Sequence, residues 1–212
     1  NELVIDLVNH AAQTERMQLV VRGYNDGFAF CYKIPDGKGP CVNVQSELTA
    51  YNFAGDYTAW FYNGENHNIG PEKLTETDGT RLPVMTVKAG DKHYMAIHEA
   101  CLETGAPLVL QSKGGESLFS VASKPTSLSP GYTSAWRVVL YGTTPGVLTD
   151  SHLLELLNPD PDSRYDFSWV KPGLAVWDWR INGAVWDGFT YGMSYPSWVR
   201  MVDFAAEQGF KY

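Results

Sequence analysis

The sequence predicts a mainly β protein, in which two packed antiparallel sheets are followed by a single βα unit of the kind that builds (β/α)8 barrels. Three observations lead to this prediction. Residues 1–142 contain short apolar runs separated by Gly, Pro and Asp clusters, residues 158–162 form a Pro/Asp break, and residues 172–212 read as strand, Gly-spaced loop, helix and strand.

The first strands are marked by alternating side chains and by a turn. Glu2–Asn9 carries apolar residues at both alternating sets of positions, so both of its faces are expected to be partly covered. Met17–Tyr24 and Phe28–Ile34 flank Asn25-Asp26-Gly27, and an Asp-Gly step between two alternating apolar runs is a strong hairpin signal. The further strand candidates are 47–53, 57–62, 83–89, 93–101, 107–112, 117–123 and 134–142.

A Pro/Asp stretch divides the chain. Thr149–Leu157 reads as a short helix with Thr149 or Asp150 as its cap and a leucine-rich face. Asn158-Pro159-Asp160-Pro161-Asp162 ends this helix. The stretch is the natural boundary between a first domain, 1–160, and a second domain, 161–212.

The second domain is expected to be one βα unit. Residues 172–179 form its strand, a helix capped by Ser194 follows at 194–208, Gly209 ends the helix, and 210–212 begins another strand. The helix carries an apolar stripe that must pack on a sheet, which a lone βα unit does not have. The chain therefore reads as a barrel truncated after its first unit.

Composition excludes some classes of function. The chain has 212 residues, is 44% hydrophobic and carries a formal net charge of −8. This composition is typical of a folded protein and argues against nucleic-acid partners, because phosphate binding needs a Lys/Arg surface. No run approaches the roughly 18 apolar residues that a membrane span requires.

Cysteines and aromatic residues give weaker signals. Cys31, Cys41 and Cys101 show no CxxC spacing. Cys31 and Cys41 could pair across a hairpin, or all three could be small buried side chains. The surplus of seven Trp, twelve Tyr and nine Phe fits a sugar-binding surface, because the flat faces of sugars stack on aromatic rings.

Trp177, Asp178 and Trp179 form the first candidate site, at the end of the 172–179 strand. Alternation along a strand places the two Trp side chains on one face and Asp178 on the other. In barrels of βα units, chemistry lies on the loops that follow the strands, so one Trp could floor a sugar subsite. The alternative is ordinary barrel packing, with Asp178 capping a turn.

Glu99 is the second candidate, within the apolar strand 93–101. A carboxylate there is either exposed at a sheet edge or held by a positive partner, because burying it alone is costly. A calcium ion, which takes oxygen ligands, would be such a partner. His98 beside Glu99 suggests zinc only weakly, since no second His accompanies it, and a packing role is favoured.

Several blocks of residues stand out together: Asn1-Glu2-Leu3, 23–30, Glu99-Ala100, Trp136-Arg137, 168–173, Trp177-Asp178-Trp179 and 202–206. These blocks resemble glycoside hydrolase family 97. Their order and separation match that family over nearly the whole chain. The block from Ser168-Trp169-Val170-Lys171-Pro172-Gly173 to Trp177-Asp178-Trp179 is specific, and the others support it.

The resemblance implies a bacterial, periplasmic or secreted enzyme that acts on α-glucosides or α-galactosides and uses calcium. It implies an N-terminal β super-sandwich, incomplete at its start in this chain, followed by the first strand and helix of the catalytic barrel. Glu99 matches a calcium ligand of the family, and Trp177, or less surely Trp179, matches a residue that touches substrate. The family's catalytic carboxylates lie on later barrel strands, so none is assigned here.

The leading hypothesis is a fragment of a calcium-dependent, exo-acting α-glycosidase, inactive alone, with an oligosaccharide substrate and the remainder of the barrel as partners. The alternative is a stand-alone β-sandwich module that binds carbohydrate or another partner without catalysis. The sugar, the linkage and the stereochemical outcome stay open.

Overall fold

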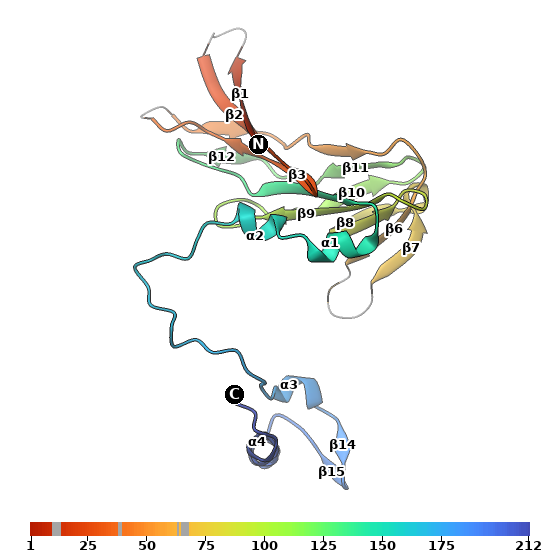
Figure 1. The fold of residues 1–212 in the computed structure, drawn as a ribbon, viewed down its shortest axis with the longest axis vertical. Helices are drawn as coiled ribbons and strands as arrows, with labels where there is room; N and C mark the ends of the chain where they lie inside the picture. Colours follow the sequence, from red (N-terminus) through yellow and green to blue (C-terminus); the bar gives the residue numbers. More distant parts are fainter. Residues whose placement is uncertain (10–13, 38–39, 63, 65–67) are drawn as a thin grey trace. The chain divides into compact units, whose positions relative to one another are not determined.

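The structure, a computed structural model, describes residues 1–9, 14–37, 40–62, 64 and 68–212. The chain forms two compact units, Asn1–Asp160 and Pro161–Tyr212 (Figure 1). The Pro/Asp stretch lies at this division. No helix in the described ranges is both long and apolar enough to cross a membrane.

The first unit is built on an antiparallel sheet that contains eleven strands within the described residues. The sheet has the order β1-β2-β3-β13-β9-β8-β10-β11-β5, and β6 pairs with both β7 and β8. The bounds are β1 Glu2–Asn9, β2 Thr14–Tyr24, β3 Gly27–Lys33, β5 Ala50–Asn52, β6 Thr58–Tyr62, β7 Ile69–Lys73, β8 Asp78–Lys88, β9 Tyr94–Ala100, β10 Leu110–Lys113, β11 Leu118–Val121 and β13 Trp136–Gly142.

The sheet folds over itself at β8, which gives the sandwich. Residues 78–81 of β8 pair with β10, whereas residues 85–88 pair with β6 and β9. The two layers meet in an apolar core in which Phe61 of β6 and Phe119 of β11 have ring centroids 5.7 Å apart. Figure 1 shows this two-layer arrangement. The predicted pair of packed antiparallel sheets is therefore confirmed.

A second core lies on the opposite face of β9, β13 and β3. Helices α1 (Pro145–Asp150) and α2 (Leu153–Leu157) follow β13, and Leu153 and Leu157 pack with Val138, Trp136 and other residues of that face. Two smaller elements complete the unit, the 3-10 helix η1 (Leu74–Glu76) and a separate pair of strands, β4 (Val42–Val44) and β12 (Thr126–Leu128).

The Asp26-Gly27 hairpin forms as predicted between β2 and β3. Gly27 has φ +153°, and a Cβ added there would lie 2.2 Å from the carbonyl oxygen of Val139 in β13. Only glycine permits this close approach of the backbones of β3 and β13.

Three sequence expectations in the first unit need correction. The single helix 149–157 is two helices, because Ser151 is extended and its Oγ accepts the N–H of Leu153 and contacts Asp26. Cys31, Cys41 and Cys101 are all free thiols, so Cys31 and Cys41 do not pair. Cys31 is buried in the core, Cys101 is half-buried and Cys41 is exposed, so the burial of all three is also wrong. β1 is exposed on both faces rather than partly covered.

The second unit contains α3 (Asp178–Ile181), the two-stranded β14 (Val185–Trp186) and β15 (Phe189–Thr190), and α4 (Tyr195–Gln208). α4 begins after Ser194 with Pro196 in its first turn, and it ends at Gly209 in a left-handed conformation, as predicted. Residues 172–177 form no strand, and residues 178–181 are helical rather than the end of a strand.

Backbone hydrogen bonds nevertheless join residues 174–176 to the C-terminal residue of the second unit. The N–H of Tyr212 donates to the carbonyl of Leu174 at 3.3 Å, and the carbonyl of Tyr212 accepts the N–H of Val176 at 2.9 Å. A residue that bonds in this way to the two neighbours of one opposing residue follows the parallel-strand pattern.

Candidate functional site

Glu99 is held in the interior of the sandwich by a neighbouring strand. Glu99 of β9 lies directly opposite Arg137 of β13, so both side chains point to the same face of the sheet. Nη1 of Arg137 lies 3.4 Å from Oε2 of Glu99, and the N–H of Leu108 also donates to Oε2. Arg137 is 3% exposed and Glu99 is 9% exposed. Exposure at a sheet edge, the favoured alternative before any family argument, is therefore wrong.

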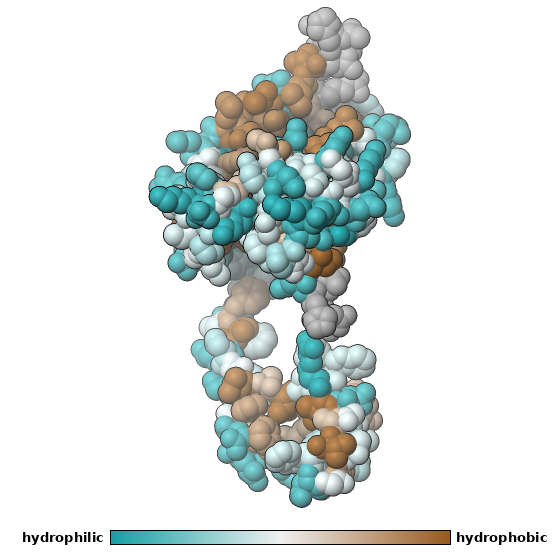
Figure 2. Space-filling model, turned by 90° about the vertical axis from the view of Figure 1, so that its right-hand side faces the viewer, coloured by the Kyte–Doolittle hydropathy of each residue, from teal (hydrophilic) through white to brown (hydrophobic). Residues whose placement is uncertain are grey.

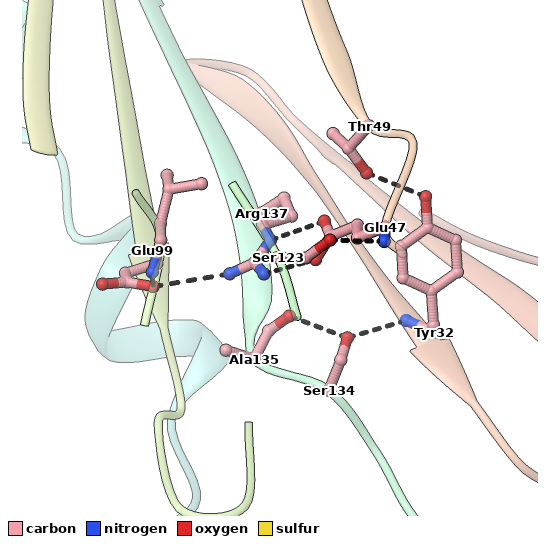
Figure 3. A network of polar contacts seen from close by, with 9 residues as sticks. Tyr32, Glu47, Thr49, Glu99, Ser123, Ser134, Ala135 and Arg137 are labelled. Carbon is pink, nitrogen blue, oxygen red and sulfur yellow. Dashed lines mark hydrogen bonds and ion pairs between the residues drawn. The ribbon is translucent and has the colours of Figure 1, made fainter. Parts of the chain in front are cut away.

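Glu47 completes the network from the other side of Arg137 (Figure 3). Its two carboxylate oxygens accept from Nε at 3.0 Å and from Nη2 at 2.7 Å, which is a bidentate pair. The backbone N–H of Glu47 donates to Oγ of Ser123 at 2.7 Å, which anchors this residue between β4 and β5. Arg137 thus uses three donor nitrogens to bind two carboxylates that come from distant parts of the chain.

Burial governs the electrostatics of this network. Burial raises the pKa of Glu99 above its ordinary value, and the N–H of Leu108 and the charge of Arg137 offset only part of that rise. Burial alone would lower the pKa of Arg137, but the hydrogen bond and charge of Glu47 raise it. Burial likewise lowers the pKa of His98, whose Nδ1 accepts the N–H of Glu99 at 2.8 Å.

Tyr51 places one further polar group near the network. Its hydroxyl is buried and has no hydrogen-bond partner among the described residues. Burial raises the pKa of Tyr51, while the charge of Arg137 acts in the opposite direction. The interior of the sandwich therefore holds a neutral phenol near the charged side chains of Glu47, Arg137 and Glu99.

The described residues do not make a calcium site by themselves. Calcium takes six to eight oxygen ligands, several of them carboxylates. Over the described ranges, no three His, Cys, Asp or Glu side chains come together as metal ligands. Oε2 of Glu99 accepts hydrogen bonds from Leu108 and Arg137. Oε1 is therefore the carboxylate oxygen without a hydrogen bond in the described part of the chain.

A cavity of about 1250 Å³ opens beside Arg137 and Glu47. Tyr32 and Tyr132 contribute aromatic rings to its wall, and Ser134 contributes a hydroxyl that accepts the N–H of Tyr32 at 2.9 Å. The remaining wall comes mainly from the 122–131 segment and from residues 104–109. The cavity therefore offers both rings and hydroxyl groups next to a buried ion pair.

The Trp177-Asp178-Trp179 cluster lies in the second unit and is arranged differently from the prediction. Because α3 begins at Asp178, strand alternation does not place the two indoles on a common face. Oδ1 of Asp178 accepts the N–H of Trp179 at 2.7 Å, which gives a partner to an N–H of the first helical turn that has none within the helix. Its Oδ2 accepts Nε1–H of Trp198 in α4 at 2.9 Å, so Asp178 ties α3 to α4.

The indoles themselves are half exposed. Trp177 is 55% exposed and Trp179 is 59% exposed. The guanidinium of Arg180 lies 5.2 Å from the ring centroid of Trp177, which is a cation–π contact. More than half of each of these two tryptophans is therefore accessible.

Sequence reasoning did not single out Arg137 or Glu47 as site residues. Arg137 stands in an apolar strand, and a charge in such a strand signals a buried partner. The partner could not be named, because the contact depends on the register between β9 and β13, which are far apart in the sequence.

These features define a β-sandwich that holds Glu47, Arg137 and Glu99 in one ion network. Residues 1–159 of the 212 match the family model described as Glycosyl-hydrolase 97 N-terminal. The chain therefore belongs to glycoside hydrolase family 97.

Two curated relatives support this assignment. A retaining alpha-galactosidase of Bacteroides thetaiotaomicron is 28% identical over 234 residues, which covers 90% of this chain and 35% of the relative. A probable retaining alpha-galactosidase of Streptomyces bingchenggensis is 29% identical over 217 residues, which covers 93% of this chain and 30% of the relative. The chain thus spans about a third of the length of the proteins that it matches.

Solved structures agree. One is a variant of a family 97 enzyme from Pseudoalteromonas sp. strain K8 in complex with panose, which superposes with a TM-score of 0.73 at 26% identity. The match covers 92% of this chain and 32% of the chain of that enzyme. A beta-arabinopyranosidase superposes with a TM-score of 0.78 over all of this chain and 37% of its own, but at 18% identity it supports the fold alone.

Proposed function

We propose that this chain is part of an exo-acting α-glycosidase that cleaves terminal α-glucosidic or α-galactosidic bonds. The family match over residues 1–159, together with two curated relatives that are retaining alpha-galactosidases, carries the proposal. Retaining glycosidases need two carboxyl groups about 5–5.5 Å apart on either side of the scissile bond. Asp178 is engaged with Trp179 and Trp198, and Glu99 is engaged with Arg137. We place the catalytic pair outside residues 1–212.

The second unit would be the first strand and helix of the catalytic barrel. The parallel pattern between Leu174, Val176 and Tyr212 supports this reading, since neighbouring strands of a barrel are parallel. Apolar side chains of the unit are also widely exposed, including Trp198 at 44% and Val202 at 63% on α4. Exposed apolar surface of this extent marks an interaction site. The partner that fits is the remainder of such a barrel.

Glu99 would supply one ligand to a calcium ion whose other ligands lie outside this chain. Support comes from Oε1, the oxygen of Glu99 that no described residue binds, and from Arg137, which fixes the carboxylate in one orientation. Titration calorimetry provides the test. The protein that carries this chain should bind calcium, and Glu99→Gln should weaken that binding at least tenfold. Unchanged affinity in the variant would remove Glu99 from the site.

Trp177, with Trp179 beside it, would stack on the sugar. Asp178 would hold α3 in place through its hydrogen bond to Trp198 of α4. An oligosaccharide substrate is supported by the panose complex of a related family 97 enzyme. We place the enzyme in the bacterial periplasm or outside the cell, where oligosaccharides are met before uptake.

Hydrolysis of p-nitrophenyl α-galactoside and α-glucoside tests the activity. The protein that carries this chain should release p-nitrophenol from at least one of the two, and residues 1–212 alone should release none. Release by residues 1–212 would contradict the placement of the catalytic pair. Failure of the longer protein on both substrates and on panose would contradict the glycosidase proposal itself.

The cavity beside Arg137 and Glu47 favours a second candidate, a sandwich that binds carbohydrate without catalysis. Its tyrosine rings and hydroxyl groups are the groups that sugar-binding sites use. Millimolar binding of panose by residues 1–160, weakened by Tyr132→Ala, would support this candidate, and no binding would dismiss it.

A further inference from the structure

β1 is the last strand on one side of the large sheet, and among the described residues no strand pairs with its other edge, called the free edge below. Asn1 and Gly23 exchange two hydrogen bonds, from the N–H of Gly23 to the carbonyl of Asn1 at 2.8 Å and from the amino group of Asn1 to the carbonyl of Gly23 at 3.1 Å. In an antiparallel ladder, such pairs alternate with pairs that make no hydrogen bond. The backbone groups of Leu3 and Ile5 therefore point toward β2, and those of Val4 and Asp6 point away from the sheet.

Both faces of β1 carry exposed apolar side chains. On one face Leu3 is 58% exposed and Ile5 is 38% exposed, and on the other Val4 is 47% and Val8 is 52% exposed. Figure 2 shows brown, apolar side chains gathered at the upper end of the larger unit, where β1 and β2 lie in Figure 1. A free edge with apolar residues on both faces is a template for adding a strand.

Each face of β1 continues a feature of the sandwich. Val4 lies opposite Val20, which belongs to the core under α2. Leu7 lies opposite Met17, which lines the cavity of the sandwich. A strand added to β1 would thus extend the core on one side and cover the mouth of the cavity on the other.

The charges of this edge do not oppose an added strand. Glu2 accepts from Nε of Arg22 in β2 at 2.7 Å, and Asp6 accepts from Nε2 of Gln18 at 2.9 Å. Edge strands are commonly protected by charges that repel a partner. Here both acidic side chains are already bound by residues of β2.

We propose that β1 is an interior strand in the intact protein and that its free edge pairs with an extended segment of the same polypeptide outside residues 1–212. The relatives are about three times as long as this chain, so such a segment has a source. Leu3, Ile5 and Leu7 form one face of β1, whereas Val4 and Val8 share the other face with Glu2 and Asp6. The segment is therefore apolar on the face that continues Leu3, Ile5 and Leu7. This proposal concerns the sandwich and does not depend on the glycosidase proposal.

Residue-specific amide hydrogen exchange tests the pairing. In residues 1–212 alone, the outward amides of Val4 and Asp6 should exchange at least a hundredfold faster than the inward amides of Leu3 and Ile5. In the protein that carries this chain, all four should be protected. Fast exchange of Val4 and Asp6 in the longer protein would overturn the proposal. Protection in residues 1–212 that rises with concentration would assign the edge to a second copy and also overturn it.

A pair of proline substitutions gives an independent readout. Val4→Pro removes an N–H that points outward, whereas the matched control Ile5→Pro removes one that bonds to β2. Val4→Pro should leave the Tm of residues 1–212 nearly unchanged and lower the Tm of the longer protein by about 5 °C or more. Ile5→Pro should lower both. An unchanged Tm of the longer protein with Val4→Pro would show that no segment pairs with this edge.

Discussion

Replacing Arg137 with Met removes the cation at the centre of the buried network. The side chains of Arg137, Glu99 and Glu47 are 3%, 8% and 18% exposed, so the charges are separated from solvent. Removing one partner of a buried ion pair costs about 3–5 kcal/mol, because a charge is left without compensation. Arg137→Met leaves Glu99 with the N–H of Leu108 as its hydrogen-bond donor within the described residues. We expect a loss of unfolding free energy in that range.

Urea unfolding of the chain, followed by far-ultraviolet circular dichroism, measures the loss. At a slope of about 2 kcal/mol per molar urea, the midpoint should fall by about 2 M. Adding Glu99→Gln to Arg137→Met should restore about half of the loss, because a neutral amide can still accept the N–H of Leu108. Lys88→Met is the matched control, since Lys88 and Asp91 form an exposed pair at 3.9 Å that contributes at most about 1 kcal/mol. A midpoint shift with Arg137→Met no larger than that of the control would refute the reasoning.

Three further predictions follow from local contacts. Gly27→Ala should lower the free energy of unfolding by about 3 kcal/mol or more, because the added Cβ would overlap a carbonyl oxygen. In the control Gly23→Ala the added Cβ meets no atom within 4 Å, so the loss should be less than about 1 kcal/mol. Denaturant titration compares the two variants, and equal losses would contradict the steric argument. Burial raises the pKa of the Cys31 thiol to about 11, so at pH 8 only about one molecule in a thousand carries the thiolate, and iodoacetamide should modify Cys41 well before Cys31; mass spectrometry of the peptides checks the order. Asp178→Ala removes the acceptor of an indole N–H and should red-shift tryptophan emission with little change in the sandwich transition, whereas Asp178→Asn should keep the emission; identical spectra for the two variants would exclude the contact.

Local signals in the sequence were enough for most of the long strands. β1 begins and ends where alternation predicted, and the Asp26-Gly27 turn set the register of β2 and β3. β4 and β12 were missed because each has three residues and gains its order from the other. β7 was missed because its sequence, Ile-Gly-Pro-Glu-Lys, contains two residues that are rare within strands.

The candidate site was only half accessible to sequence reasoning. A carboxylate at Glu99 within an apolar strand demanded a positive partner, and that demand is confirmed. The identity of the partner could not be predicted, because Arg137 lies opposite Glu99 only through pairing of two strands that are far apart in the sequence. At Trp177-Asp178-Trp179 the strand period was applied too far, since the helix α3 already begins at Asp178.

β8 gives the sandwich one continuous spine. Arg81 near its first end pairs with Leu110 in one layer, and Thr86 further along pairs with Trp60 and Ala96 in the other. The two layers cannot separate while β8 keeps its conformation, because the backbone of β8 forms strand pairs in both of them. Melting should therefore proceed as a single all-or-none event, and a defect introduced on the β10 side should weaken the β9 strand that carries Glu99.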